Sequence, residues 1–270
     1  MLIFIVSVGL GGIQAIFIWG TRWKGKVLKR HCNYTIVMQV NKRLIKDIQT
    51  MIGDEMSSLG VYYSYNEINM KKGSCLVFGP EETPYADCPL FFSVAVPSDY
   101  PFTSPVVLIR SSDGVTRLHP NLYINGKVCL SILGTYSGPS WVSTLNIGSV
   151  FKSILSLLDK NPIANEPGWE KYTLADVKAL NYAEWVEYRL LEMVVSEYGQ
   201  FKLGTNPSWE MFREVLGAVW PARWERIRAK IIERAESVGM KSYTGIPYGM
   251  GGEANWPKLL ERAIKIDSLA

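Results

Sequence analysis

One cysteine in this sequence stands in a setting that suggests chemistry rather than packing. Cys129 lies shortly after a His-Pro-Asn turn that ends at Asn121, within the stretch LHPNLYINGKVCLSIL at residues 118–133. A cysteine acts as a nucleophile only as its thiolate, and a free thiol has a pKa of about 8.5. The turn before Cys129 and the glycine-rich segment after it predict an accessible thiol in a shallow groove. The alternative is a small buried hydrophobe between Val128 and Leu130.

Two polar residues of the same turn could act beside this thiol. The amide of Asn121 could donate a hydrogen bond to the oxyanion that forms when a carbonyl is attacked, and losing one such donor typically costs about 10² to 10³ in rate. It could instead cap backbone groups of the turn, as asparagine often does beside proline. His119 precedes the rigid Pro120, and we expect it to make a structural hydrogen bond. A cysteine hydrolase would need this histidine as a base within hydrogen-bond reach of Cys129.

The composition is that of a globular protein with a real core. The chain has 270 residues, of which 47% are hydrophobic and 20% charged, and its net charge is +4. Because the basic excess lies near the start rather than across a folded domain, nucleic-acid binding is not expected. The four cysteines lack CxxC spacing and there are two histidines, which argues against a disulfide framework or a zinc site and for a reduced, intracellular protein.

The first 20 residues carry no charge and are followed at once by basic residues. About 20 apolar residues can cross a membrane as a helix, and positive charge directly after such a span favours a cytoplasmic location for the rest of the chain. The sequence therefore predicts a membrane anchor at 1–20, a basic linker at 21–35 and a cytosolic remainder. A peripheral hydrophobic arm or a packing segment is the alternative.

The middle of the chain predicts an α+β domain. Apolar residues at helical spacing indicate a helix within 36–52 and another over 147–159, which Asn146 is placed to cap. Between them, four runs rich in β-branched and aromatic residues predict consecutive antiparallel strands. These runs are residues 61–66, 75–79, 90–96 and 106–110.

The last part of the chain predicts a helical extension over 173–270. The periodicity indicates four helices, at 182–198, 207–220, 222–239 and 256–266. The glycine-rich segment 244–255 is expected to be a flexible loop. Tryptophans at helical spacing are expected in the core; they are Trp185, Trp209, Trp220 and Trp224. A packing extension and a platform for a substrate or partner both remain open.

Two stretches carry a resemblance to a known family. GPEETPYADCPLFFSVAVPSDYPFTSPVV, followed by HPNLYINGKVCLSIL, resembles the catalytic domain of ubiquitin-conjugating enzymes in order and spacing. The resemblance implies a UBC-like domain over 36–172, with an N-terminal helix, a four-stranded antiparallel sheet and a central helix. NEPGWE at 165–170 and the lengthened loop before Trp141 most resemble the conjugating domains of large hybrid conjugating and ligase enzymes such as apollon.

The resemblance implies roles for individual residues. Cys129 would accept ubiquitin as a thioester from an activating enzyme, and Asn121 would stabilise the oxyanion or support the loop. Glu166, and less clearly Asp159, would position and deprotonate the attacking lysine; a solvated loop carboxylate is the alternative for Glu166. Scaffold roles are implied for His119, Pro120, Tyr85, Pro101 and Trp141. The resemblance implies no metal and no small cofactor, because ATP is consumed by the upstream activating enzyme.

The sequence departs from the family pattern at the surface where ligases usually bind. Phe102 keeps half of the usual docking surface for ligases, whereas Trp141-Val142-Ser143 alters the other half, so transfer without a separate ligase is an open interpretation. The expected partners are ubiquitin, its activating enzyme, protein substrates, a ligase in the usual scheme, and a membrane through residues 1–20. Conjugation of another ubiquitin-like modifier and a catalytically silent ubiquitin-binding scaffold are the alternatives.

Overall fold

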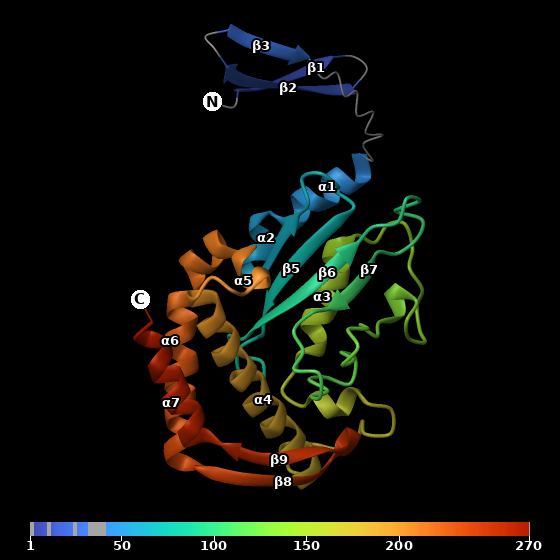
Figure 1. The fold of residues 1–270 in the computed structure, drawn as a ribbon. Helices are drawn as coiled ribbons and strands as arrows, with labels where there is room; N and C mark the ends of the chain where they lie inside the picture. Colours follow the sequence, from blue (N-terminus) through green and yellow to red (C-terminus); the bar gives the residue numbers. More distant parts are fainter. Residues whose placement is uncertain (1–2, 10–11, 24–25, 32–41, 270) are drawn as a thin grey trace. The chain divides into compact units, whose positions relative to one another are not determined.

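A computed structural model of the chain describes residues 3–9, 12–23, 26–31 and 42–269 (Figure 1). These residues belong to two compact units, Met1–Lys42 and Arg43–Ala270. The expected helix within 36–52 is seen as α1 (Lys42–Met51), and its earlier residues lie outside the described part of the chain.

The first unit is a three-stranded antiparallel sheet rather than the expected helix. Its strands are β1 (Ile3–Gly9), β2 (Gly12–Trp23) and β3 (Lys26–His31), in the order β1-β2-β3. The helix expected over 1–20 is therefore wrong for the residues described, and part of the expected linker 21–35 also belongs to strands. β-Branched residues favour a pleated strand, and glycine is a poor helix former. Within the described parts of the chain, no helix is both long and apolar enough to cross a membrane.

The second unit contains the predicted four-stranded antiparallel sheet, which is confirmed. Its strands are β4 (Val61–Tyr65), β5 (Lys72–Phe78), β6 (Pro89–Ala95) and β7 (Val106–Ile109), in that order. Two helices, α1 and α2 (Asp54–Ser58), come before the sheet in the chain. The predicted later helix is α3 (Ile147–Leu157), and Asn146 caps it by accepting a hydrogen bond from the backbone N–H of Ser149 at 2.8 Å.

Both faces of this sheet are covered, and two adjacent residues of β6 show how. Successive side chains of a strand point to opposite faces. The ring of Phe92 lies 5.7 Å from that of Phe151 in α3. The ring of Phe91 lies 5.9 Å from that of Trp209 and 6.0 Å from that of Phe212, both in the C-terminal extension. The extension therefore completes the core on one face of the four-stranded sheet and is not an appendage.

The extension contains four helices and a hairpin. In chain order these are α4 (Val177–Lys202), α5 (Pro207–Glu210), α6 (Arg213–Ser237), β8 (Met240–Ile246), β9 (Met250–Asn255) and α7 (Trp256–Asp267). Helix α6 passes through Pro221, so the expected boundary between 207–220 and 222–239 is wrong. The segment 244–255, expected to be a flexible loop, instead forms most of the β8–β9 hairpin, which lies beside α4 (Figure 1). The four tryptophans expected in the core are buried.

An ion-pair cluster fixes the extension to the loop between β5 and β6. The carboxylate of Asp87 accepts hydrogen bonds from Arg226 at 2.7 and 2.5 Å and from Arg223 at 2.8 Å. Burial raises the pKa of this carboxyl, but the hydrogen bonds from the two arginines outweigh it and hold the pKa below its usual value. In the same loop, a Cβ added to Gly79 would lie 1.9 Å from the carbonyl oxygen of Tyr85, so only glycine fits there.

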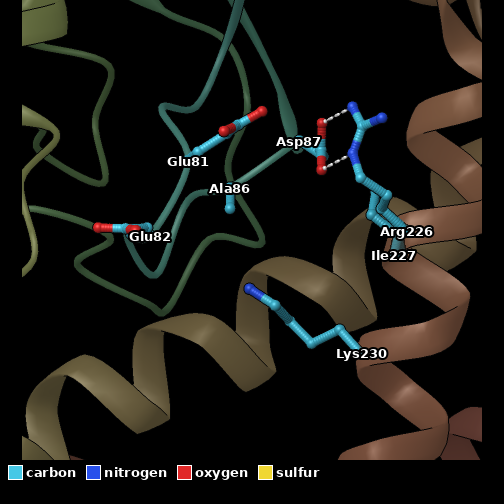
Figure 2. A pocket seen from close by; sticks show the side chains of 7 residues that line it. All are labelled: Glu81, Glu82, Ala86, Asp87, Arg226, Ile227 and Lys230. Carbon is cyan, nitrogen blue, oxygen red and sulfur yellow. Dashed lines mark hydrogen bonds and ion pairs between the residues drawn. The ribbon is translucent and has the colours of Figure 1, made fainter.

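A cavity of about 290 Å³ lies at this junction. Figure 2 shows side chains of the β5–β6 loop facing side chains of α6 across it, with the Asp87–Arg226 pair at one side. The lining is mixed in charge, with Glu81 and Glu82 opposite Lys230. The ammonium of Lys230 also pairs with Glu187 of α4 at 3.2 Å. The cavity is thus part of the seam between the sheet and the extension.

Candidate active site

Cys129 and Asn121 are joined by hydrogen bonds in both directions. The backbone N–H of Cys129 donates to the carbonyl of Asn121 at 2.8 Å, and Nδ2 of Asn121 donates to the carbonyl of Cys129, also at 2.8 Å. Leu122 and Val128, one residue inside this pair, form an antiparallel bridge. The His-Pro-Asn turn and the cysteine are therefore brought together as the two sides of one small loop.

The thiol of Cys129 is covered, contrary to the expected accessible groove. Only 6% of Cys129 is exposed, and its Sγ donates a hydrogen bond to the carbonyl of Thr135 at 3.0 Å. The hydroxyl of Thr135 in turn accepts from the N–H of Leu130 at 2.9 Å and donates to the carbonyl of Val128 at 2.7 Å. These bonds fold the segment after the 3-10 helix η1 (Ser131–Leu133) back over the sulfur. Thr135 was missed in the sequence because it lies in a glycine-rich loop with no motif around it.

His119 serves the turn rather than the thiol. It is fully buried, and its Nδ1 accepts a hydrogen bond from the backbone N–H of Asn121 at 2.9 Å. Burial lowers the pKa of His119 to about 3, against a smaller opposing effect of the Leu157 carbonyl. The imidazole is therefore neutral at physiological pH. Its Nδ1, which could otherwise accept a proton from a thiol, already accepts the hydrogen bond from Asn121. The cysteine hydrolase alternative finds no support in this arrangement.

The hydroxyl of Tyr85 supports the same turn from the core. Tyr85 is fully buried, and its hydroxyl donates to the carbonyl of Leu118 at 2.7 Å. Its ring centroid lies 6.3 Å from that of His119. A large side chain from the β5–β6 loop thus fixes the residue that immediately precedes the His-Pro-Asn turn.

Arg117 is a second residue of the site that the sequence did not reveal. Its guanidinium donates to the carbonyls of His119, at 3.2 Å, and Pro120. The same group lies over the ring of Tyr123, 3.4 Å from its centroid, and over the ring of Tyr248 at 4.8 Å. Cations are attracted to the faces of aromatic rings at such distances. The turn is therefore held from outside by one arginine placed between two tyrosines.

Glu166 follows the 3-10 helix η2 (Pro162–Asn165) and is partly exposed. Its Oε2 accepts a hydrogen bond from the hydroxyl of Tyr248 at 2.6 Å. Tyr248 lies in the 3-10 turn η3 (Pro247–Gly249) between β8 and β9. Asp159, the other carboxylate considered, accepts from the N–H of Asn161 at 2.8 Å and from Nδ2 of Asn165 at 3.0 Å. Both oxygens of Asp159 therefore hold the loop itself, which leaves Glu166 as the better candidate.

The expected docking residues are exposed at the surface. Phe102 is 80% exposed and Val142 is 54% exposed. Between them, Nε1 of Trp141 donates to the carbonyl of Pro101 at 2.7 Å, and the Trp141 ring lies 6.0 Å from that of Tyr100. Trp141 thus ties the loop that follows Cys129 to the PSDYPF segment and leaves the side chain of Phe102 in solvent.

The fold and this site define the class of protein. A family model described as "Ubiquitin-conjugating enzyme" matches residues 43–186, more than half of the chain. The chain belongs to the ubiquitin-conjugating enzyme family. The matched region includes the sheet, the Cys129 loop and Glu166, and it ends inside α4.

Particular relatives sharpen this placement. The chain is similar to ubiquitin-conjugating enzyme E2 Z of Homo sapiens, with 39% identity over 140 residues, 51% of this chain and 39% of that protein. The E2 Z of Danio rerio is 35% identical over 194 residues, 71% of this chain and 57% of that protein. The human dual conjugating enzyme and ligase BIRC6 is 40% identical over 121 residues, 43% of this chain and 2% of that protein. The expected likeness to hybrid enzymes is confirmed, and the chain spans less than two thirds of the length of these relatives.

Proposed function

We propose that this protein accepts ubiquitin on Cys129 as a thioester and transfers it to a lysine of a substrate. In the first step the Cys129 thiolate attacks the thioester carbonyl that the activating enzyme presents, a new C–S bond forms, the old C–S bond breaks, and the cysteine of the activating enzyme leaves as a thiolate. In the second step a lysine amine attacks the same carbonyl, loses a proton, and the Cys129 thiolate leaves. A covalent intermediate of this kind divides acyl transfer into two easier steps. The observation that carries the proposal is the two-way pairing of Cys129 with Asn121.

Asn121 has two contributions in this scheme. A primary amide carries two N–H donors, and one of them supports the loop by bonding the Cys129 carbonyl. The second N–H, on the same nitrogen, is the donor that we assign to the oxyanion that develops when the thioester carbonyl is attacked. A donor aimed at developing charge stabilises the transition state more than the ground state. Loop support and oxyanion stabilisation are therefore compatible in a single side chain.

Glu166 is the group that we assign to the attacking amine. A protonated lysine is a poor nucleophile, so a carboxylate that accepts its hydrogen bond orients the amine and takes its proton. Glu166 is partly exposed and presents one oxygen, Oε2, to Tyr248. The second oxygen is then the natural acceptor for the incoming amine.

Formation of the thioester requires the covering loop to shift. A thioester sulfur has no hydrogen to donate, so the bond from Sγ to the Thr135 carbonyl is lost when ubiquitin is loaded. Glycines with positive φ stand on either side of Thr135, Gly134 at 67° and Gly138 at 133°. Glycine adopts such conformations at little cost, which suits a segment that must uncover the sulfur.

The partners follow from the same proposal. Ubiquitin, its activating enzyme and protein substrates are required, and ATP is used only by the activating enzyme. Phe102 remains available to a ligase, while Val142 alters the neighbouring surface, so we propose that transfer can also proceed without a separate ligase. The described cysteines Cys75, Cys88 and Cys129 are free thiols, which suits a reducing compartment such as the cytosol.

The test is a loading reaction with the full chain, ubiquitin, its activating enzyme and ATP, analysed on gels with and without reductant. We expect a reductant-sensitive adduct with the parent protein. Cys129→Ser should give a reductant-resistant oxyester, and Cys129→Ala should give no adduct. Cys88→Ala is a matched control that removes another buried thiol and should load as the parent does.

Two outcomes would contradict the proposal. An adduct that survives in Cys129→Ala would place the acceptor elsewhere. No adduct with the parent, under conditions that load a control conjugating enzyme, would favour another ubiquitin-like modifier or a silent ubiquitin-binding scaffold. Repeating the reaction with other modifiers and their activating enzymes separates these two.

A further inference from the structure

We infer that Tyr248, at the tip of the β8–β9 hairpin, is a positioning residue for the transfer step because it holds the carboxylate of Glu166 in place. The inference rests on the proposed function, in which Glu166 receives the lysine amine. It assigns the C-terminal extension a part in the second chemical step, beyond its packing against the sheet. Four features of the structure support it.

The first feature is the contact itself. The Tyr248 hydroxyl donates to Oε2 of Glu166 at 2.6 Å. Burial, followed by the hydrogen bond and charge of Glu166, raises the pKa of Tyr248 well above its usual value. The hydroxyl therefore stays protonated and remains a donor at any physiological pH. A bond from a neutral donor to a carboxylate is stronger than one between two neutral groups, so it can fix the orientation of a carboxylate on a surface loop.

The second feature is that the Tyr248 ring connects Glu166 to the cysteine loop. The Arg117 guanidinium, which donates to the carbonyls of His119 and Pro120, lies 4.8 Å from the centroid of the Tyr248 ring. A single side chain thus contacts the carboxylate through its hydroxyl and the support of the His-Pro-Asn turn through its ring. This arrangement fixes the acidic residue relative to the turn that contains Asn121.

The third feature is that the hairpin is anchored where it meets the site. Ile246 pairs with Met250 across the tip, and the sulfur of Met250 accepts from the backbone N–H of Arg117 at 3.1 Å. The Tyr182 hydroxyl of α4 donates to the carbonyl of Arg117 at 2.9 Å, and its ring lies 6.0 Å from that of Tyr248. The hydroxyl of Tyr248 is therefore presented from a rigid support.

The fourth feature is the backbone of Tyr248, which has φ 65° and ψ 20°. This left-handed conformation is unfavourable for a residue with a Cβ. Glycine would avoid that cost, and glycine already stands beside it at Gly249. Residues held in such conformations concentrate at functional sites. A purely structural tip would be better served by glycine, whereas a role for the side chain explains why a tyrosine stands there.

The experiment compares two tyrosines of the same hairpin. Tyr248→Phe removes the hydroxyl but keeps the ring against Arg117. Tyr243→Phe is the matched control, because Tyr243 of β8 also donates to a glutamate at 3.0 Å, but that glutamate is Glu184 of α4 and not Glu166. Each full-length variant is loaded with ubiquitin, the activating enzyme is stopped, and discharge of the thioester is followed over a range of free lysine concentrations. Discharge to a small thiol is measured in parallel.

We expect Tyr248→Phe to load normally and to release ubiquitin to the small thiol at the parental rate, because neither reaction needs an amine to be positioned. Its discharge to lysine should fall by roughly tenfold or more, the size expected for one hydrogen bond to a charged group. The fall should appear in the maximal rate rather than in the half-saturating lysine concentration. Tyr243→Phe should match the parent in all assays.

A double-mutant cycle separates positioning from general damage. Glu166→Ala should slow discharge to lysine, and adding Tyr248→Phe should cause no further loss, because the hydroxyl then has nothing to hold. The inference would be overturned by additive losses, by an equal slowing of discharge to the small thiol, by no change, or by faster discharge to lysine. Failure of the parent to load would instead count against the proposed function, so the two failures are distinguishable.

Discussion

The two candidate reactive groups of this site are held by different parts of the chain. Cys129 is fixed by its own neighbourhood, since its partners Asn121 and Thr135 lie within a few residues of it. Glu166 is fixed by Tyr248, 82 positions further along the chain. The direct contacts of Cys129 are therefore local, whereas the contact that holds Glu166 comes from the C-terminal extension. Loading and transfer should respond to different substitutions as a result.

The largest expected effect tests the contact between Asn121 and Cys129. Asn121→Ala removes the amide that donates to the Cys129 carbonyl and, in the proposed function, to the oxyanion. Discharge of the thioester to lysine should fall by about 10² or more. Single-turnover discharge after loading measures it. Asn125→Ala is the control, since its Oδ1 accepts from the N–H of Lys127 in the same loop and the proposed function gives it no role. A fall of less than about threefold in Asn121→Ala would contradict the role assigned to Asn121.

A second substitution tests how firmly the extension is attached. Asp87→Asn removes the charge that Arg223 and Arg226 share. Because the Arg226 side chain is half exposed and screened by solvent, we expect a loss of roughly 1–3 kcal/mol in the free energy of unfolding, less than for a fully buried pair. The pKa of Asp87 is depressed in the folded protein, so this stabilisation is present above the unfolded pKa of about 3.9 and is lost as the pH falls through the lower folded value. Urea unfolding at pH 7 and near pH 3 checks both points.

The control for Asp87 is Glu81→Gln, an exposed carboxylate that lines the same cavity. An exposed charge contributes about 0–1 kcal/mol, so this variant should stay close to the parent. Equal stability of Asp87→Asn and the parent at pH 7 would contradict the anchoring role of the ion pairs. A difference that persists undiminished at pH 3 would show that the effect comes from something other than the carboxylate charge.

The smallest expected effect concerns the cover over the sulfur. Thr135→Val keeps the side-chain shape but removes the hydroxyl that links Val128 to Leu130. The loop should open more often, and modification of Cys129 by a maleimide should become roughly threefold to tenfold faster. Cys129→Ser gives the background from other thiols, and the exposed Thr144, changed to Val, is the matched control. An unchanged rate would show that the hydroxyl does not hold the loop closed.

The parts of the fold that were predictable are those where one local rule decides the outcome. Alternating and β-branched residues located β4 to β7, and Asn146 marked the start of α3. The hairpin β8–β9 was missed because glycine is ordinarily a loop former. Here Gly252 is required for another reason: a Cβ at that position would lie 3.0 Å from the ring of Trp185. That contact joins distant parts of the chain and leaves no local pattern.

The site residues also divide into those marked by a local sequence pattern and those brought together only by folding. Cys129, Asn121 and His119 could be found because they stand in one continuous motif. Thr135, Arg117 and Tyr248 could not, since their importance depends on carbonyls and rings brought near by folding. Of these three residues, only Arg117 lies beside the motif in the sequence, directly before Leu118, but its contacts with the turn are not visible there. The expected accessibility of Cys129 failed because a loop with a flexible composition is pinned by one threonine hydroxyl.

The most direct test of the division between the two sites measures loading and lysine discharge side by side for Thr135→Val and Tyr248→Phe. We expect Thr135→Val to change both steps, because the cover over the sulfur takes part in each, and Tyr248→Phe to change only discharge to lysine. If both variants altered both steps alike, the division between a local thioester site and an extension-dependent amine site would be contradicted.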